Sequence, residues 1–166
     1  NAANGVLARS PDGTLELLSV QPINEEGNTM LAAQSGRDLN LAILVRTTVH
    51  LPRVIVSVGI NSLYDIRVAV LHSDITGHNL SLPPGTHAIV CRVPHFPLSV
   101  GTYVMDVKVY VKESFGQKVV LWAPRVTTLT VEAGDFYNTG NLPSPNWGGF
   151  CYLQQQWKVE YNVEQC

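Results

Sequence analysis

Apolar and polar residues alternate with a period of two along most of the chain. In the run 38–47, Leu39, Leu41 and Ile43 share one face. Asn40 and Arg46 fall on the other face. A strand that is buried on one face sends successive side chains to opposite sides, so this alternation predicts half-buried β-strands. We expect eight of them, at residues 14–21, 29–33, 38–47, 53–61, 66–72, 86–93, 102–112 and 119–132, the last of which Pro124 can interrupt.

Turn-forming residues separate the predicted strands. Clusters of Gly, Pro, Asn and Asp occupy residues 74–79, 82–85, 94–101 and 114–116. These residue types supply the positive or fixed φ that tight turns need. Because no segment has a helical period, the short strands predict an all-β fold, an antiparallel β-sandwich with Ig-like or jelly-roll connections. We assign this sandwich to residues 14–134 and expect residues 1–13 to be a linker from a preceding domain outside this chain.

The chain changes character after Gly134. Residues 135–149 are rich in Gly, Pro, Asn and Ser and have no period, but alternation returns in residues 157–163. Such a long irregular connection is unusual inside a compact domain unless it is functional or reaches elsewhere. We therefore predict that residues 135–166 form a tether and a C-terminal strand of the same domain, which two copies exchange in a homodimer. The seam of the exchanged strand would consist of Trp157, Val159, Tyr161 and Val163.

Composition predicts a polar surface that is poor in charge. Asp, Glu, Lys and Arg make up 14% of the residues, against about 25% in an ordinary soluble domain, and the net charge is −2. This surface suits a neutral polar partner, and the lack of a basic cluster argues against nucleic acid. No apolar run is long enough for a transmembrane span.

The chain has three cysteines, Cys91, Cys151 and Cys166, and none of them is in C-x-x-C spacing. This odd number favours a reducing compartment over a disulfide framework or a zinc knuckle.

Signatures of catalysis are absent from the sequence. It contains no nucleophile elbow, no P-loop and no dinucleotide-binding motif. The five histidines are not spaced as a local metal pair, so we expect no metal, no cofactor and no enzymatic activity. Two carboxylates that meet across strands would suffice for a glycosidase, with Asp106 as one candidate. That alternative stays open here, although a solvated surface carboxylate is the simpler interpretation.

Three segments carry a resemblance to a known family. The first, HAIVCRVPHFPLSVGTY at residues 87–103, has a strand, a Pro-hydrophobic-Pro-Leu turn and a Gly-x-Tyr that opens the next strand. The second is VEAGDFYNTG at residues 131–140, and the third is Trp157-Lys158-Val159. In this order they resemble the C-terminal carbohydrate-binding domain of the ATPase subunit of bacterial O-antigen polysaccharide ABC transporters. The resemblance runs from Leu15 to Val163.

The resemblance implies an Ig-like sandwich that binds the export-ready end of lipid-linked O-antigen polysaccharide and gives the exporter its substrate specificity. It also implies a homodimer with an exchanged C-terminal strand. Further partners would be a nucleotide-binding domain of the same polypeptide, placed before Asn1 and carrying the ATPase activity, and the transporter's membrane subunit. The implied location is cytoplasmic, at the inner face of the bacterial inner membrane. The alternative is an Ig-like structural or adhesive domain of a surface protein that binds another protein.

The alternation also predicts a glycan site on one sheet face. Sugars offer hydroxyl groups to side chains that donate and accept hydrogen bonds, and a C–H face to aromatic rings. If the valines of run 53–61 point inward, polar and small residues of that strand face outward, beside the outward residues of run 102–112. In an Ig-like order these two strands are neighbours. The predicted carbohydrate-binding residues are Arg53, Ile55, Ser57, Asp106, Lys108 and Tyr110.

Other aromatic residues have structural interpretations. Tyr103 follows Gly101 at the start of a predicted strand. This placement is typical of a tyrosine corner, in which the hydroxyl binds backbone and the ring lies in the core. Phe136 and Tyr137 are expected to cover the open end of the sandwich rather than to contact a ligand.

Overall fold

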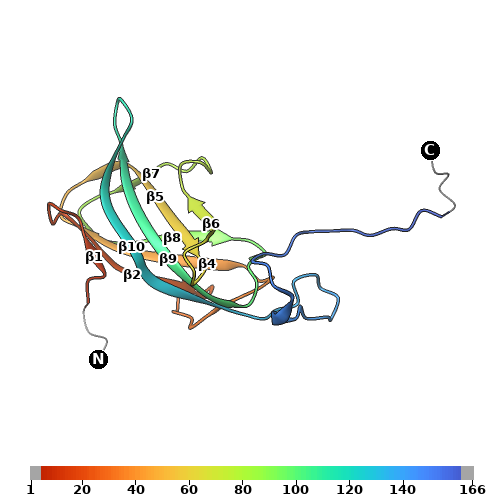
Figure 1. The fold of residues 1–166 in the computed structure, drawn as a ribbon. Helices are drawn as coiled ribbons and strands as arrows, with labels where there is room; N and C mark the ends of the chain where they lie inside the picture. The colour runs from red at the N-terminus through yellow and green to blue at the C-terminus, as the bar shows by residue number, and fades with distance from the viewer. Residues whose placement is uncertain (1–4, 162–166) are drawn as a thin grey trace.

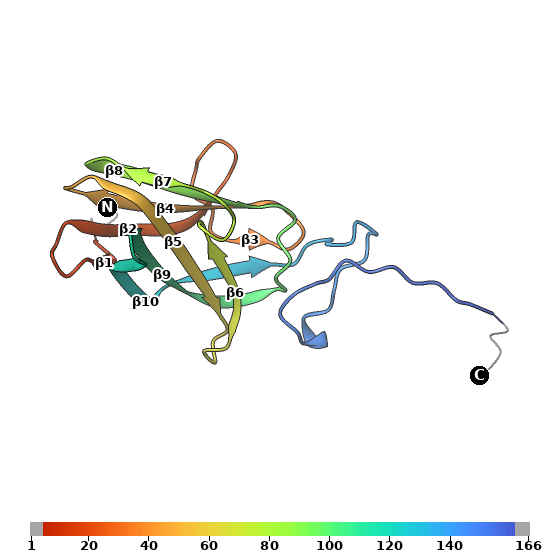
Figure 2. The same ribbon diagram turned by 90° about the horizontal axis from the view of Figure 1, so that it is seen from above.

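Two β-sheets packed face to face make up the protein, whose computed structural model describes residues 5–161. The first sheet has the strand order β1-β2-β4-β8. The second has the order β3-β10-β9-β5-β6, and β7 also pairs with β5. Figures 1 and 2 show the two layers and the long β9–β10 hairpin. The strands are β1 Ala8–Arg9, β2 Leu15–Ile23, β3 Ala33–Gln34, β4 Leu39–Thr47, β5 Leu51–Asn61, β6 Arg67–His72, β7 Leu80–Leu82, β8 Gly85–Val93, β9 Gly101–Lys112 and β10 Gln117–Glu132.

The core lies between the sheets and is built from the inward positions that the alternation predicts. In β4, Leu41 and Ile43 are fully buried. In β5, Val54, Val58 and Ile60 are buried in the same cluster. Each fully buried aliphatic side chain contributes about 1.5–3 kcal/mol relative to an exposed one, so these rows account for much of the stability. The prediction of an all-β sandwich is therefore confirmed.

Some predicted strands have different limits in the structure. Most of the predicted strand 29–33 is absent, because Thr29 makes only an isolated bridge to Ile23 and the short β3 begins at Ala33. β3 pairs with β10 in parallel, whereas the other strand pairs are antiparallel. Pro124 does not break β10, and a register shift between Ala123 and Thr127 accommodates it instead. Such bulges are a common way for a long strand to keep pairing around an irregular residue.

The segment after β10 leaves the sandwich. It includes one short 3₁₀ turn, η1 at Pro145–Trp147, and returns to bridge Leu98 through Cys151. Residues 152–161 form no strand within this chain and run away from the sheets, as the blue end of the ribbon shows in Figure 1. The predicted C-terminal strand is thus absent from this part of the single chain, and Val163 lies outside the described residues. No helix in residues 5–161 is long and apolar enough to cross a membrane.

Candidate functional site

The two strands that carry the predicted glycan-binding residues are neighbours in the second sheet. In the β5–β9 pair, Ile55 lies opposite Tyr110, Ser57 opposite Lys108, and Gly59 opposite Asp106. Because the core residues of β5 alternate with these positions, the pairs share the outer face of the sheet. We call this surface the outer face of the second sheet. It brings together five of the six predicted residues in three adjacent rows.

An aromatic and cationic cluster occupies the centre of this face. Lys108 lies opposite Trp122 of β10, and its ammonium nitrogen is 4.5 Å from the centroid of the Trp122 ring. The same nitrogen is 6.0 Å from the centroid of the Tyr110 ring. A cation over the negative face of an aromatic ring is attracted to it, so the two rings orient the lysine. In the described part of the chain, no carboxylate pairs with Lys108.

Trp122 is a residue of this face that sequence reasoning missed. Trp122 is 46% exposed and lies where, among the described strands, β10 has only β9 as a paired neighbour. The signal was present in the sequence, because Leu121 and Ala123 point into the core and Trp122 must therefore point outward. The bulge that surrounds Pro124 hides this alternation further along the strand.

Asp106 lies on the same face but has a structural role. Its carboxylate accepts hydrogen bonds from Asn61 Nδ2 at 3.0 Å, from Arg67 Nη2 at 2.8 Å and from the backbone nitrogen of Arg125 at 2.7 Å. The residue is 8% exposed. A carboxylate accepts through two oxygens, so three internal donors leave little capacity for a ligand.

Gly59 makes this arrangement possible. The Arg67 guanidinium lies directly over it, and a Cβ at position 59 would stand 2.0 Å from Arg67 Nη1. Only a residue without a side chain allows this close approach. The Arg67–Asp106 ion pair is therefore built into the sheet rather than added to its surface.

Two of the predicted binding residues thus offer little surface to a ligand. Ile55 points outward but is only 2% exposed. The Asp106 carboxylate already accepts hydrogen bonds from other residues of the chain. Ser57, Lys108 and Tyr110 are half-buried. Arg53 is exposed and has a left-handed backbone conformation, with φ of 52°, at a register shift in the β5–β7 pair. The accessible part of the face consists of Ser57, Lys108, Tyr110 and Trp122, and Arg53 lies before the first β5–β9 pair.

The tyrosine corner predicted at Tyr103 is present. The Tyr103 hydroxyl donates to the backbone oxygen of Ser99 at 2.7 Å, and the residue is 3% exposed. Burial raises the pKa of Tyr103 above its ordinary value, while the hydrogen bond with Ser99 opposes this effect. The corner fixes the turn that leads into β9.

The segment after β10 is attached to the same end of the sandwich, as predicted. Phe136 is buried, with its ring centroid 4.1 Å from that of His95 and 5.4 Å from that of Tyr152. The Asp135 carboxylate accepts hydrogen bonds from the backbone nitrogens of Thr139, at 3.1 Å, and Gly140, at 2.8 Å. These contacts cover the open end of the sandwich and begin the return of the chain.

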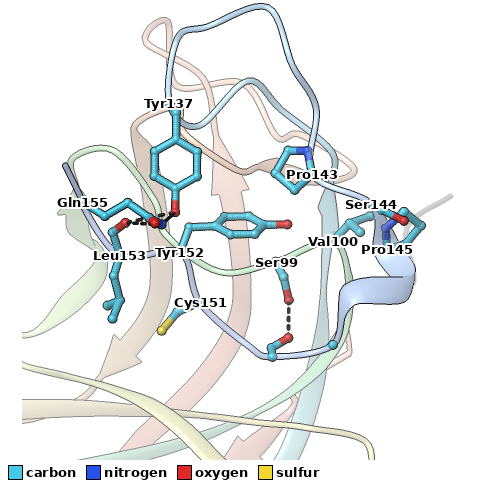
Figure 3. A pocket seen from close by; sticks show the side chains of 12 residues that line it. Ser99, Val100, Tyr137, Pro143, Ser144, Pro145, Cys151, Tyr152, Leu153 and Gln155 are labelled. Atoms are coloured by element: carbon cyan, nitrogen blue, oxygen red, sulfur yellow. Dashed lines mark hydrogen bonds between the residues drawn. The ribbon is translucent and has the colours of Figure 1, made fainter. Parts of the chain in front are cut away.

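A cavity of about 400 Å³ lies where this segment meets the turn before β9. We call it the end pocket. Figure 3 shows its side chains, with Tyr137 and Tyr152 beside one another and the Tyr152 ring extending toward Val100. Burial raises the pKa of Tyr152 above its ordinary value. No sequence signal marked this pocket, because its walls come from segments without a period.

The predicted seam residues of the C-terminal strand are solvent-exposed in the single chain. Trp157 is 89% exposed, Val159 69% and Tyr161 81%. A row of large apolar side chains that the rest of the chain does not bury is an exposed apolar surface, which often marks a site of protein contact. Separately, no group of three or more His, Cys, Asp or Glu side chains in residues 5–161 is arranged to hold a metal ion.

The protein is therefore an all-β sandwich domain in which the outer face of the second sheet carries polar and aromatic side chains. A comparison with family descriptions matches residues 7–152 to the Wzt C-terminal domain. The chain belongs to this family. The match confirms the resemblance drawn from the motifs at residues 87–103 and 131–140, both of which lie inside the matched span. Membership supports a role in an O-antigen ABC transporter.

Solved structures agree with this fold. A crystal structure of the C-terminal domain of Wzt has a TM-score of 0.68 at 10% identity, over 89% of this chain and 84% of that one. A CARDB domain in complex with di-metal ions, from Pyrococcus furiosus, has a TM-score of 0.37 at 13% identity, over 72% and 86% of the two chains. That similarity is too low to support an argument. No curated protein matches the sequence.

Proposed function

We propose that the chain is a non-catalytic domain that binds O-antigen polysaccharide and thereby gives an ABC exporter of lipid-linked polysaccharide its substrate specificity. The observation that carries the proposal is the cluster of Lys108, Tyr110 and Trp122 on the outer face of the second sheet. Family membership supports the transporter context. The low share of charged residues agrees with a neutral, hydrated ligand.

Each part of the cluster matches one feature of a sugar. The C–H face of a pyranose ring packs against the π-face of Trp122, which is the most exposed ring of the cluster. The Lys108 ammonium donates up to three hydrogen bonds, and the Ser57 hydroxyl opposite it both donates and accepts. Because the rings already orient Lys108, little side-chain entropy is lost when the sugar binds.

Affinity for one sugar unit is expected to be modest. Each hydrogen bond to the glycan replaces hydrogen bonds that both partners make to water, so the net gain is about 0.5–1.5 kcal/mol. Selectivity comes from the penalty for the wrong sugar, since a mismatched hydroxyl leaves a buried polar group without a partner. This combination suits a domain that must recognise a polymer and then release it.

The arrangement of carboxylates supports a non-catalytic role. A glycosidase needs two carboxyl groups on either side of the scissile bond, one of which gives a proton to the leaving group. The carboxylate at the centre of this face, Asp106, accepts from three internal donors. It therefore lacks the access that a general acid requires. We propose that the ATPase activity belongs to a nucleotide-binding domain of the same polypeptide.

We also propose the surroundings in which the domain works. Its partners are that nucleotide-binding domain and the membrane subunit of the transporter, and its place is the cytoplasmic face of the bacterial inner membrane. The family match supports these assignments. Nucleic acid is not a partner, because the chain has a net charge of −2 and no basic cluster.

The proposed homodimer exchanges the C-terminal segment. Trp157, Val159 and Tyr161 occupy every second position and are exposed. This pattern is expected of a strand whose apolar face packs on the sheet of another copy. The strand β8 ends the first sheet, and its inward residues, including Ile89 and Cys91, are only half-buried. An unpaired edge beside incompletely covered core residues can pair with an added strand. We therefore propose β8 as the edge that receives the segment from the second copy.

The function is tested by substitution of Trp122. Trp122→Ala removes the sugar platform and leaves the core positions unchanged, so binding to the cognate O-polysaccharide should weaken about tenfold. Phe115→Ala is the matched control, because Phe115 is a 96% exposed aromatic residue at the tip of the same hairpin. Calorimetric titration of both folded variants measures the effect. Equal binding by Trp122→Ala and the parent domain would overturn the placement of the site.

A further inference from the structure

The end pocket is preformed by hydrogen bonds between its walls. The Ser99 backbone nitrogen donates to the Phe150 oxygen at 2.9 Å, and the Tyr152 nitrogen donates to the Pro97 oxygen at 2.8 Å. The Tyr137 hydroxyl donates to the Leu153 oxygen at 2.9 Å and accepts from Gln155 Nε2 at the same distance. A pocket whose walls are tied in this way needs little rearrangement to accept a ligand. Its volume of about 400 Å³ lies within the usual range for small-molecule sites.

The lining of the pocket selects for a neutral ligand. None of its described residues carries a formal charge. An ionic ligand would lose water without gaining a partner of opposite charge, which is costly. The lining instead offers the rings of Tyr137 and Tyr152, 6.3 Å apart between centroids, and the oxygen of the Ser99 hydroxyl, which donates its proton to the Gly149 carbonyl. Aromatic faces beside hydrogen-bonding groups match a molecule with one C–H face and many hydroxyls.

The pocket is distinct from the outer face of the second sheet. Val100, which lines the pocket, immediately precedes β9, whereas Lys108 lies eight residues further along the chain. At about 3.3 Å per residue, the two positions are roughly 26 Å apart along the strand. One sugar unit cannot reach both positions, but a polymer of several units can.

We propose that the end pocket binds one neutral sugar unit and is a second carbohydrate subsite of this domain. The inference rests on the proposed glycan-binding function. A polymer that occupies both subsites binds more tightly than either subsite alone, because the second contact becomes intramolecular.

The direct test uses free monosaccharides as probes and amide NMR of the isotope-labelled chain. A panel of neutral hexoses, 6-deoxyhexoses and N-acetylhexosamines should shift the amides of Ser99, Gly149 and Tyr152, while glucuronic acid and glucosamine should not. If neutral sugars shift only the amides of Ser57, Lys108 and Trp122, the pocket proposal fails and the proposed function stands. If polysaccharide shifts neither set, the proposed function itself fails.

Variants of the two tyrosines separate binding from folding. Tyr152→Leu should weaken binding of the neutral sugar to the end pocket about tenfold, which corresponds to about 1.4 kcal/mol. Tyr152→Phe keeps the ring and should retain most of the binding affinity. Tyr64→Leu is the matched control, because Tyr64 is an 87% exposed tyrosine in the turn between β5 and β6. An unchanged response in folded Tyr152→Leu would overturn the proposal.

A second measurement needs no change in the pocket's walls. Cys151 lines the pocket and is exposed, so a bound sugar should slow its alkylation by iodoacetamide. Cys91 is the internal reference, because it lies outside the pocket and burial raises the pKa of its thiol. Protection of Cys151 by a neutral sugar, with no change at Cys91, supports the proposal. Equal alkylation rates with and without every sugar of the panel would contradict it.

Discussion

Asp106 illustrates how one residue links the strands of the second sheet. The side chain starts on β9, pairs with Arg67 of β6 and Asn61 of β5, and accepts from the backbone of Arg125 in β10. It therefore joins four strands at the point where β10 shifts register. The Arg125 backbone has a φ of 47°, and the Asp106 hydrogen bond holds that conformation. A carboxylate is well suited to this position because it accepts from several donors at once.

Loss of this carboxylate should reduce stability more than loss of an ordinary surface charge. Asp106→Ala removes one acceptor each from Asn61 and Arg67 and the acceptor of the Arg125 amide, so we expect the free energy of unfolding to fall by about 1–3 kcal/mol. Asp74→Ala is the control, because its ion pair with Lys112 is more exposed and should contribute about 0–1 kcal/mol. Urea denaturation measures both. Equal losses would show that Asp106 is an ordinary surface charge.

Asp12 should make stability depend on pH in the acid range. Hydrogen bonds from the Ser10 hydroxyl, and from the backbone and hydroxyl of Thr14, lower the pKa of Asp12 from 3.8 to about 2. Because the folded-state pKa is depressed, this contribution is present above the unfolded pKa and is lost as the pH falls toward 2. Asp12→Asn removes the titration. Thermal unfolding between about pH 4 and pH 2 should show a steeper loss in the parent chain than in the variant, and parallel curves would refute this assignment.

Among the elements, β9 contributes residues both to the core and to the candidate site. Its inward residues, such as Met105 and Val107, are fully buried, and its outward residues carry the aromatic and cationic cluster. The Tyr103 corner fixes the start of the strand, and the turn before it forms one wall of the end pocket. Both candidate subsites therefore depend on one strand whose direction the core determines.

The elements also show what could be predicted from sequence. Alternation predicted β2, β4, β5 and the other long strands because each has one face in the core. It missed β7, whose three residues are too few to show a period. It predicted the direction of Ile55 but not its burial, since alternation describes a strand and not what covers it. The end pocket lies outside any periodic segment, so only the folded chain reveals it.

The C-terminal segment leads to a prediction about oligomeric state. A chain that ends at residue 152 keeps both sheets and the contacts around Phe136, but it lacks the exposed row at Trp157, Val159 and Tyr161. We expect the full chain to be a dimer and the shortened chain a folded monomer, as light scattering after size exclusion would show. A triple substitution of these three residues by Ser is the second test. A monomeric full chain would contradict strand exchange.

At the scale of the whole molecule, the protein is a sandwich with the proposed binding surface on one sheet and the end pocket at one end. The core is continuous across both sheets, so it holds the strands that carry the proposed binding surface in constant relative positions. If one polymer binds both proposed subsites, a fixed spacing between them selects for a repeat of matching length. Weak contacts to single sugars would then combine into a selective contact with the polymer.

Selective recognition of O-antigen polysaccharide can be measured by calorimetric titration of the domain with a panel of purified O-polysaccharides. We expect saturable binding to one polysaccharide structure, weakened by Trp122→Ala, and no heat of binding with the others or with dextran. Absence of binding to the whole panel, or equal binding to every polymer in it, would rule out the proposed function.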